Sequence, residues 1–392
     1  MDIFYAIFCI FTTTILLLLL LFSALVLRIF LGKSIKNPNY PPVVGTVFDQ
    51  VFYFKRLYDY QTGAAKKHKT SRLLAPDQSE IYTIEPRNIE HILKTNCSKY
   101  SKGQYNQEIW SDLFGRGIFV VDGDKWKQQR KLASFEFSTR VLREFSCLNE
   151  KEDILSRFLV ESNKDPKTVT DEYLRDIILN FIIAGKDTTA NTLSWFIYIL
   201  CKNPLIREKV AQEIGRVISC PTNETSVSDF VESITNEALE GMHYLHATLT
   251  ETLRLYPAVP VDGRCAESDD VLPDGFKVKK GDGVYYMAYA MARMPHIWGY
   301  DAEEFRPERW LKNRMFQPES PFKFVAFHAP RTCLGKDFAY RQMKIVSAAF
   351  VHFFRFRMSD DTQNVTYRTM LTLHISGSLN IHAVPRTGLS EA

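Results

Sequence analysis

The N-terminal segment constrains the fold most, because residues 3–27 carry no charge and residues 16–22 are six leucines followed by a phenylalanine. A helix needs about 20 apolar residues to cross a bilayer core, and this run of roughly 25 exceeds that length. It is also too long for the apolar region of a secretory signal, and no small-residue cleavage site follows it. A buried core helix is the alternative, but so pure a leucine run at a terminus favours a membrane helix.

Three cations, Arg28, Lys33 and Lys36, follow this run. Basic residues beside a membrane helix stay on the cytosolic side, so we expect the rest of the chain in the cytosol, attached to the endoplasmic reticulum membrane by a single pass. The prolines of residues 37–42 predict a stiff hinge. We therefore expect a transmembrane anchor over residues 1–30, a proline-rich hinge over 31–45 and a folded body over 46–392.

Composition narrows the class of the folded body. Hydrophobic residues make up 45% of the chain and the formal net charge is +4. These values fit a globular body with an anchor and argue against a nucleic-acid partner. Seven cysteines are scattered along the chain without a CxxC pair. This pattern predicts a reducing compartment, and neither a disulfide framework nor a zinc site.

One cysteine stands on a short predicted loop near the C-terminus. Arg331 precedes Cys333 by two residues, Gly335 follows it by two, and an amphipathic helix is predicted over residues 336–354. A cysteine thiolate can be the axial ligand of a haem iron. Arg331 can pair with a haem propionate, and Gly335 lets the loop lie flat against a macrocycle. A buried structural cysteine is the alternative, and the loop alone favours it.

A candidate ion pair lies about eighty residues upstream. Glu251 and Arg254 share one face of a helix predicted over residues 242–255, which Pro257 ends. Arg309 offers a second guanidinium for the same carboxylate. A solvated surface pair would explain Glu251 and Arg254 equally well, but the order of the motifs favours a structural triad.

A long, mostly apolar segment over residues 171–202 predicts a helix capped by Thr170. Gly185 removes a side chain in its middle, and Asp187 and Thr188 place an acid beside an alcohol. Such a pair can deliver protons to a reaction in an adjoining groove. A buried helix with small residues for close packing is the alternative.

Trp126 and Arg130 are four residues apart and therefore lie on one face of a predicted helix. A surface helix anchored by a tryptophan is the commoner explanation of such a pair. Its position before the other three motifs favours a functional role.

Short β-like runs divide the remaining chain. Residues 73–76 and 80–84 predict one small sheet, and residues 276–278 and 284–286 predict further strands. A second β pair is predicted between residues 365–375 and 379–384. Other long segments are helical, so we expect a mostly α (α+β) fold with small side sheets.

Taken in order, the four motifs resemble those of cytochrome P450 haem-thiolate monooxygenases. The resemblance implies haem b with Cys333 as its axial ligand. It implies contacts with the haem from four further residues, namely Trp126, Arg130, Arg331 and Gly335. The pair on the central helix would deliver protons during oxygen activation, and the ion-pair triad would hold the fold. Electrons would come from an NADPH–cytochrome reductase in the same membrane, since the chain has no GxGxxG loop of its own.

Four further stretches, residues 73–80, 260–264, 281–286 and 336–342, resemble plant long-chain fatty-acid ω-hydroxylases. This resemblance implies a long-chain fatty acid as substrate and an ω-hydroxy acid as product. It extends over nearly the whole chain, from the anchor to about residue 386.

Two departures from the family pattern bear on activity. The family carries a glycine between the residues here numbered Ala329 and Pro330, so this cysteine loop is one residue short. The stretch between the Trp126 helix and residue 171 lacks several helices, including the pair that roofs the substrate channel. We therefore expect an internally shortened form without part of the helical roof. It is either a working monooxygenase or an inactive membrane-anchored remnant with impaired haem binding.

Overall fold

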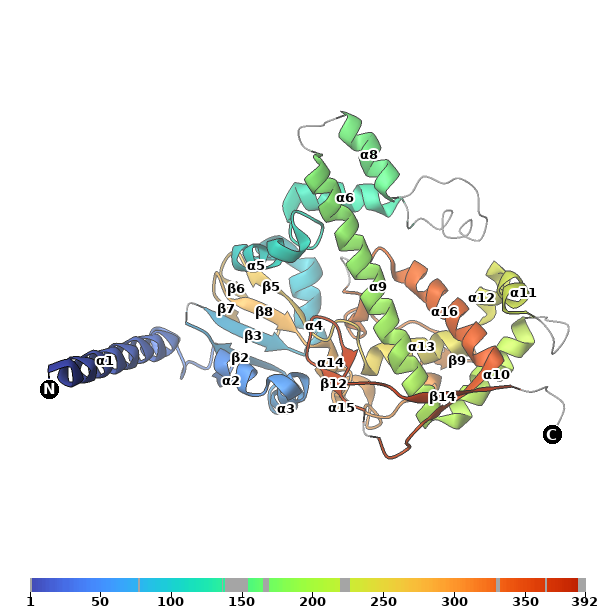
Figure 1. The fold of residues 1–392 in the computed structure, drawn as a ribbon. Helices are drawn as coiled ribbons and strands as arrows, with labels where there is room; N and C mark the ends of the chain where they lie inside the picture. The colour runs from blue at the N-terminus through green and yellow to red at the C-terminus, as the bar shows by residue number, and fades with distance from the viewer. Residues whose placement is uncertain are drawn as a thin grey trace. The chain divides into compact units, whose positions relative to one another are not determined.

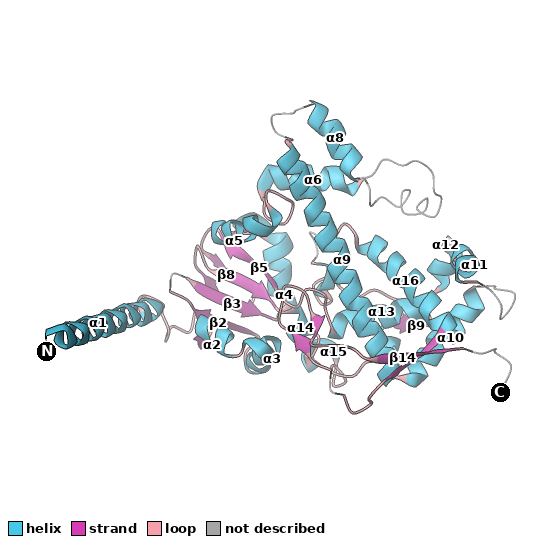
Figure 2. Ribbon diagram, viewed as in Figure 1, coloured by secondary structure: helices cyan, strands magenta, loops and turns pink. Residues whose placement is uncertain are grey.

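The protein is described here by a computed structural model that covers residues 2–76, 78–135, 137, 154–164, 169–218, 226–328, 332–363 and 365–386. Two compact units are present, one made of Met1–Gly103 with Gly263–Met287 and the other of Gln104–Asp262 with Ala288–Ala392. Helices predominate and the strands form small sheets (Figure 2). The predicted mostly helical α+β class is therefore confirmed.

The first unit begins with α1 (Asp2–Phe30), drawn in dark blue in Figure 1. Its stretch Ile3–Phe30 has a mean hydropathy of 2.7, and none of it is buried within the protein. The helix is therefore long and apolar enough to cross a membrane, as the leucine run predicts.

The first unit contains a six-stranded sheet with the strand order β1-β2-β3-β8-β5-β4. Its strands are β1 (Val43–Thr46), β2 (Thr70–Leu74), β3 (Ser79–Thr83), β4 (Tyr100–Ser101), β5 (Asp262–Ala266) and β8 (Gly283–Tyr286). β2 and β3 pair antiparallel, from Thr70 opposite Thr83 to Leu74 opposite Ser79, which confirms the first predicted small sheet. β8 joins β3 in parallel, so strands about 200 residues apart in sequence are neighbours.

Short elements complete the first unit. They are α2 (Val47–Phe52), η1 (Phe54–Arg56), α3 (Leu57–Lys67), α4 (Pro86–Glu90), η2 (His91–Thr95), η3 (Cys97–Lys99) and the antiparallel pair β6 (Asp270–Val271) and β7 (Lys277–Val278). The segment predicted as a hinge supplies β1. The Arg72 guanidinium also holds this segment by donating hydrogen bonds to the carbonyl oxygens of Lys33, Ser34 and Pro41.

The long central helix of the second unit is α9 (Asp171–Lys202), drawn in green in Figure 1. The Thr170 side chain accepts a hydrogen bond from the Tyr173 amide, so the predicted N-cap is present. Helices α10 (Pro204–Val217), α13 (His243–Leu255) and α16 (Lys336–Phe353) pack against α9. Their apolar faces share one core that includes Leu200, Ile214, Leu249 and Ala348.

The other helices of the second unit are shorter. They are α5 (Gln104–Phe114), α6 (Gly123–Ser134), α8 (Ile154–Lys164), α11 (Val227–Glu232), α12 (Asn236–Gly241), α14 (Ala288–Met291), α15 (Pro295–Trp298), η4 (Pro307–Trp310) and η5 (Val325–Phe327). The helices expected around Trp126, Glu251 and after Cys333 are thus all present.

Three two-stranded ladders complete the second unit. They are β9 (Leu311–Lys312) with β10 (Met315–Phe316), β11 (Phe354–Met358) with β14 (Ile381–Pro385), and β12 (Tyr367–Arg368) with β13 (His374–Ile375). The predicted pairing of residues 365–375 with 379–384 is therefore wrong. β14 pairs instead with β11, which begins where α16 ends. Alternating apolar residues predict a strand but not its partner, because pairing depends on long-range packing.

Candidate functional site

The Glu251 carboxylate on α13 is the centre of a buried network. Arg254 donates from Nε to Glu251 Oε2 at 2.7 Å and from Nη2 to Oε1 at 2.8 Å. Arg309 Nε lies 3.3 Å from Oε1. Glu251 is 0% and Arg254 2% exposed. The structure therefore brings the predicted triad together, as a bidentate ion pair that a second guanidinium joins.

Three further residues in this network were not predicted, one of which is Arg306, whose backbone amide donates to Glu251 Oε1 at 3.0 Å. Trp310 Nε1 donates to Glu251 Oε2 at 2.9 Å, and the Asp301 carboxylate lies 3.3 Å from Arg309 Nη1. Trp310 follows Arg309 directly in the sequence. Its position next to a predicted member of the triad could therefore have identified it as a further partner of Glu251. Asp301 lies eight residues before Arg309 in a loop, and no local pattern identifies it.

Backbone carbonyls use the remaining donors of both arginines. Arg254 donates to the carbonyl oxygens of Ala292, Ala302 and Glu304, and Arg309 donates to those of Trp298 and Asp301. Burial lowers the pKa of Arg254, while the Glu251 carboxylate opposes this shift. Since the charges are satisfied within the protein, the network connects α13 to the loops that follow α14.

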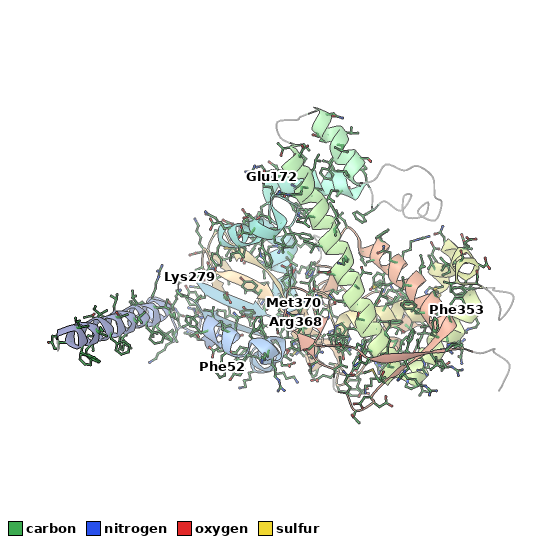
Figure 3. All side chains as sticks on the ribbon, viewed as in Figure 1. Phe52, Glu172, Lys279, Phe353, Arg368 and Met370 are labelled. Atoms are coloured by element: carbon green, nitrogen blue, oxygen red, sulfur yellow. The ribbon has the colours of Figure 1, made fainter. Side chains whose placement is uncertain are left out.

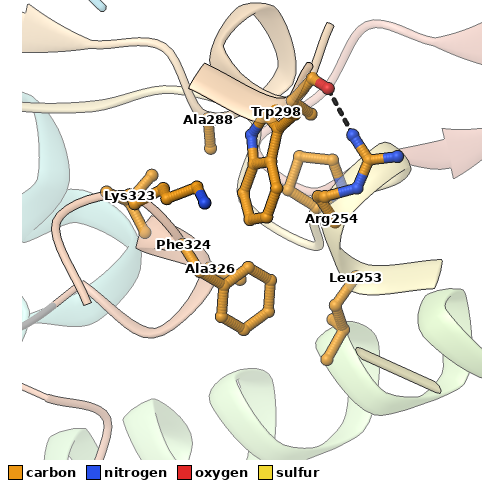
Figure 4. A pocket seen from close by; sticks show the side chains of 10 residues that line it. Leu253, Arg254, Ala288, Trp298, Lys323, Phe324 and Ala326 are labelled. Carbon is orange, nitrogen blue, oxygen red and sulfur yellow. Dashed lines mark hydrogen bonds between the residues drawn. The ribbon is translucent and has the colours of Figure 1, made fainter. Parts of the chain in front are cut away.

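A cavity of about 10 Å³ lies beside this network, lined by Arg254, Trp298, Lys323 and Phe324 among others (Figure 4). The Lys323 ammonium lies 4.6 Å from the centre of the Trp298 ring. A cavity of this size holds at most about one water molecule. This cavity beside Glu251 is therefore too small for a substrate, and the buried network around Glu251 supports the fold.

Cys333 lies in the loop before α16, for which Gly335 is the N-cap residue. The Cys333 amide donates to the Phe327 carbonyl oxygen at 3.0 Å, which ties the loop to η5. The residue is exposed. Desolvation of the thiol raises the pKa of Cys333, while the Gly335 amide and the charge of Arg130 lower it. The loop thus presents an exposed cysteine with a donor and a cation near its thiol, and desolvation of the thiol keeps its pKa above the ordinary value.

The residues before Cys333 are only partly described. Residues 329–331 lie outside the described part of the chain, so the structure does not place Arg331 or the position of the missing glycine. His328, directly before them, has a φ of 53°, in the left-handed region that non-glycine residues rarely adopt. Its Nδ1 lies 3.5 Å from Asp262 Oδ2.

Trp126 and Arg130 on α6 reach this loop. The Arg130 guanidinium lies 5.4 Å from the centre of the Trp126 ring, which confirms that they share a face. Arg130 Nη2 also donates to the Thr332 carbonyl oxygen at 2.6 Å. A residue 202 positions away in sequence therefore holds the backbone immediately before Cys333.

Asp187 and Thr188 lie on α9, and both are half-buried. The Thr188 hydroxyl donates to the Ala184 carbonyl oxygen at 2.6 Å, so it turns onto the backbone as predicted. A Cβ at Gly185 would have no atom within 4 Å. In the described part of the chain neither Asp187 nor Thr188 hydrogen-bonds to Trp126, Arg130 or Cys333.

Comparisons with known proteins agree with this geometry. The sequence model of the family "Cytochrome P450" matches residues 140–380. Cytochrome P450 704C1 from Pinus taeda is 41% identical over 90% of this chain and 93% of its own length. Cytochrome P450 704B1 from Arabidopsis thaliana is 31% identical over 89% of this chain and 95% of its own length. This chain belongs to the cytochrome P450 family.

The comparisons also show that this cytochrome P450 is shortened. The alignment with the Pinus taeda relative has 484 positions, whereas the chain has 392 residues, so at least 92 positions have no counterpart here. The alignment spans 93% of the relative, so its unmatched positions fall between matched segments of this chain. The expectation of an internally shortened form is therefore confirmed, and its location stays a prediction.

The residues around Cys333 fit the haem-thiolate group that a cytochrome P450 holds. A Cβ at Gly335 would lie 3.5 Å from the Phe137 ring and 3.9 Å from Cys333 Sγ, which are ordinary van der Waals contacts. The Phe137 ring also packs near Phe181 and Phe338, at 6.1 and 6.3 Å between ring centres. Such an apolar, aromatic surface suits a flat macrocycle.

Proposed function

We propose that this cytochrome P450 binds haem b through Cys333 and hydroxylates long-chain fatty acids at the ω position, using dioxygen and electrons from an NADPH–cytochrome reductase. The observation that carries the haem proposal is the hydrogen bond from Arg130 to Thr332, because it joins two separate family motifs at the ligand cysteine. The fatty-acid proposal is supported by the four ω-hydroxylase-like stretches of the sequence.

Each site residue has a role that its surroundings support. Cys333 would supply the thiolate, and the Gly335 amide would stabilise its negative charge. Trp126 and Arg130, with Arg331, would contact the haem propionates. The bound haem supplies oxygen activation and insertion of one oxygen atom into a C–H bond.

The protons for this reaction would pass through α9. Asp187 is a half-buried carboxyl that can exchange protons with solvent, and Thr188 is the adjacent hydroxyl. The Thr188 hydroxyl can release its bond to Ala184 and donate toward the open space that Gly185 leaves beside the helix. The triad of Glu251, Arg254 and Arg309 would act only through the fold.

We also propose the cellular arrangement. Residues 1–30 would anchor the protein in the endoplasmic reticulum membrane, and residues 31–45 would connect this anchor to the folded body. Residues 46–392 would lie in the cytosol and receive electrons from the reductase in the same membrane. The exposed apolar stretch Ile3–Phe30 supports the anchor, and the cations after it support the orientation.

The carbon monoxide difference spectrum of the reduced, membrane-expressed full chain tests the haem proposal. A red-shifted thiolate-type Soret band that Cys333→Ser abolishes would support it. Cys97→Ser, at another exposed cysteine, serves as the matched control and should leave the band unchanged. A blue-shifted band or no haem signal would contradict it. Product analysis with long-chain fatty acids and added reductase then tests the ω position.

A second candidate is suggested by the internal shortening of the chain relative to the Pinus taeda protein. A chain lacking at least 92 positions of its relative could be a membrane-anchored remnant without turnover and with impaired haem binding. Normal thiolate haem and fatty-acid turnover would exclude this candidate. Its signature is a stable, membrane-bound protein that takes up no haem.

A further inference from the structure

A cleft of about 570 Å³ lies within the first unit, where α1 ends. Its lining comes from the last turns of α1, the turn after it, the connection between β2 and β3, and the loop before β8. Lys279, in that loop, is labelled in Figure 3 close to the end of α1. No part of the proposed haem site belongs to this cleft.

Positive charge predominates in the cleft. Among the described residues, the lining contains five cations, Arg28, Lys33, Arg72, Lys279 and Lys280, and one carboxylate, Asp282. The Asp282 carboxylate already accepts hydrogen bonds from the amides of Ser79 and Lys279, at 3.0 and 2.9 Å. Arg72 is directed toward backbone carbonyls. The side chains of Lys279 and Lys280 are exposed.

Part of the lining is apolar. Ala24, Leu27 and Leu31 contribute to it from α1 and the turn that follows. The cleft therefore combines apolar and basic side chains. Free inorganic phosphate would use only the basic side chains, whereas a phospholipid has a phosphate headgroup beside acyl chains and would use both.

The position of the cleft agrees with such a ligand. An apolar helix that crosses a bilayer ends at the level of the lipid headgroups, and the lining of the cleft includes Arg28, the basic residue in the last turn of α1. Basic clusters at this level attract anionic lipids, and basic pockets beside membrane helices bind their headgroups.

We propose that this cleft binds the headgroup of an anionic phospholipid, with the phosphate near Lys279 and Lys280 and the acyl chains along Leu27 and Leu31. The bound lipid would connect α1 to the sheet of the first unit. The proposal is independent of haem binding, so its failure would leave the proposed function untouched.

The experiment uses the full chain in nanodiscs of phosphatidylcholine with a minor fraction of phosphatidic acid. Phosphatidic acid that stays bound after transfer to detergent is counted by native mass spectrometry. Lys279→Gln/Lys280→Gln should weaken retention, by up to about thirty-fold if each cation contributes as cations near an anionic surface do. The charge-conserving pair Lys279→Arg/Lys280→Arg should retain the lipid.

Lys66→Gln/Lys67→Gln is the matched control, because this exposed lysine pair lies at the end of α3 in the same unit but outside the cleft. The proposal predicts full retention in this control and no displacement of the lipid by inorganic phosphate. Equal loss in both double glutamine variants would show a general effect of net charge and would overturn the proposal. Displacement by inorganic phosphate would overturn it too, because the cleft would then be a phosphate site.

Discussion

The network around Glu251 and the loop around Cys333 lie in the same unit, and each contains an ionisable side chain. They differ in how many hydrogen-bonding and charged partners the protein supplies to that side chain. Glu251 is completely buried and takes its donors from Arg254, Arg309 and Trp310. Cys333 is exposed and has a backbone amide and one nearby cation. The first region is complete once the chain has folded. Under the proposed function the second region is half of a site, and a bound haem would supply the other half.

The largest effect is expected for Glu251→Gln. This change leaves the buried charge of Arg254 without its counterion and Arg309 with Asp301 alone. Breaking a buried pair in this way typically costs 3–5 kcal/mol, about the size of a marginal folding free energy. The free energy of unfolding in urea measures it. Glu172→Gln removes an exposed partner of Arg175 and should cost about 1 kcal/mol or less. A loss below 1 kcal/mol in Glu251→Gln would show that the network is not essential for the fold.

A pH effect in the same helix comes next. The His246 ring on α13 stacks on Tyr340, at 4.2 Å between ring centres, and lies 4.1 Å from Phe316. Burial, with the charges of Lys344, Lys336 and His243, lowers the pKa of His246 to about 3. The unfolded chain therefore binds a proton between about pH 6.5 and 3 that the folded chain does not bind. Folding stability should fall with falling pH in this window, by at most roughly 1.4 kcal/mol per pH unit from this group.

His246→Phe tests that effect. It keeps an aromatic ring in place and removes the titration, so the free energy of unfolding should depend less steeply on pH below 6.5 than in the unchanged protein. His382→Phe, at an exposed position on β14, is the control and should keep the original slope. An unchanged slope in His246→Phe would mean that another group causes the acid sensitivity.

The two regions also differ in how far the sequence predicts them. The spacing of Glu251 and Arg254 predicts their contact because residues three apart on a helix are neighbours. Thr170 and the Asn203-Pro204 pair likewise predict both ends of α9, since caps and prolines act locally. The apolar run in the same way predicts α1.

Contacts between distant segments could not be predicted from local sequence patterns. The pairing of β14 with β11, the Asp301 carboxylate beside Arg309 and the bond from Arg130 to Thr332 join residues that no local pattern relates. The resemblance to a family led to Arg130 because the family order placed it near the haem. It did not suggest the left-handed conformation of His328, which depends on how this particular loop closes.

Arg130→Gln probes the link between α6 and the cysteine loop. The variant loses a charge-assisted hydrogen bond to Thr332, a type worth about 1.5–3 kcal/mol, so haem affinity should fall roughly tenfold or more. Haem titration of the purified protein measures the change, and Lys131→Gln, at the exposed neighbouring position, is the control. Arg130→Gln should destabilise the haem-free chain less than Glu251→Gln does. Equal destabilisation would show that the contacts of Arg130 are as important for folding as the network around Glu251, and the comparison between the two regions would be wrong.

The smallest effect on stability is expected for Cys333→Ser, which replaces the sulfur that is the proposed iron ligand. Cys333→Ser should abolish the thiolate haem spectrum, yet change the free energy of unfolding of the haem-free chain by only about 0.5 kcal/mol, because surface substitutions away from packed features rarely cost more. The Cys333 side chain is exposed, and the bond that holds the loop to η5 comes from its backbone amide, which serine retains. Urea unfolding of the haem-free protein, compared with Glu251→Gln under the same conditions, measures the difference. A loss of several kcal/mol in Cys333→Ser would mean that the sulfur packs as a core side chain, and the alternative of a structural cysteine would then be the better explanation of this loop.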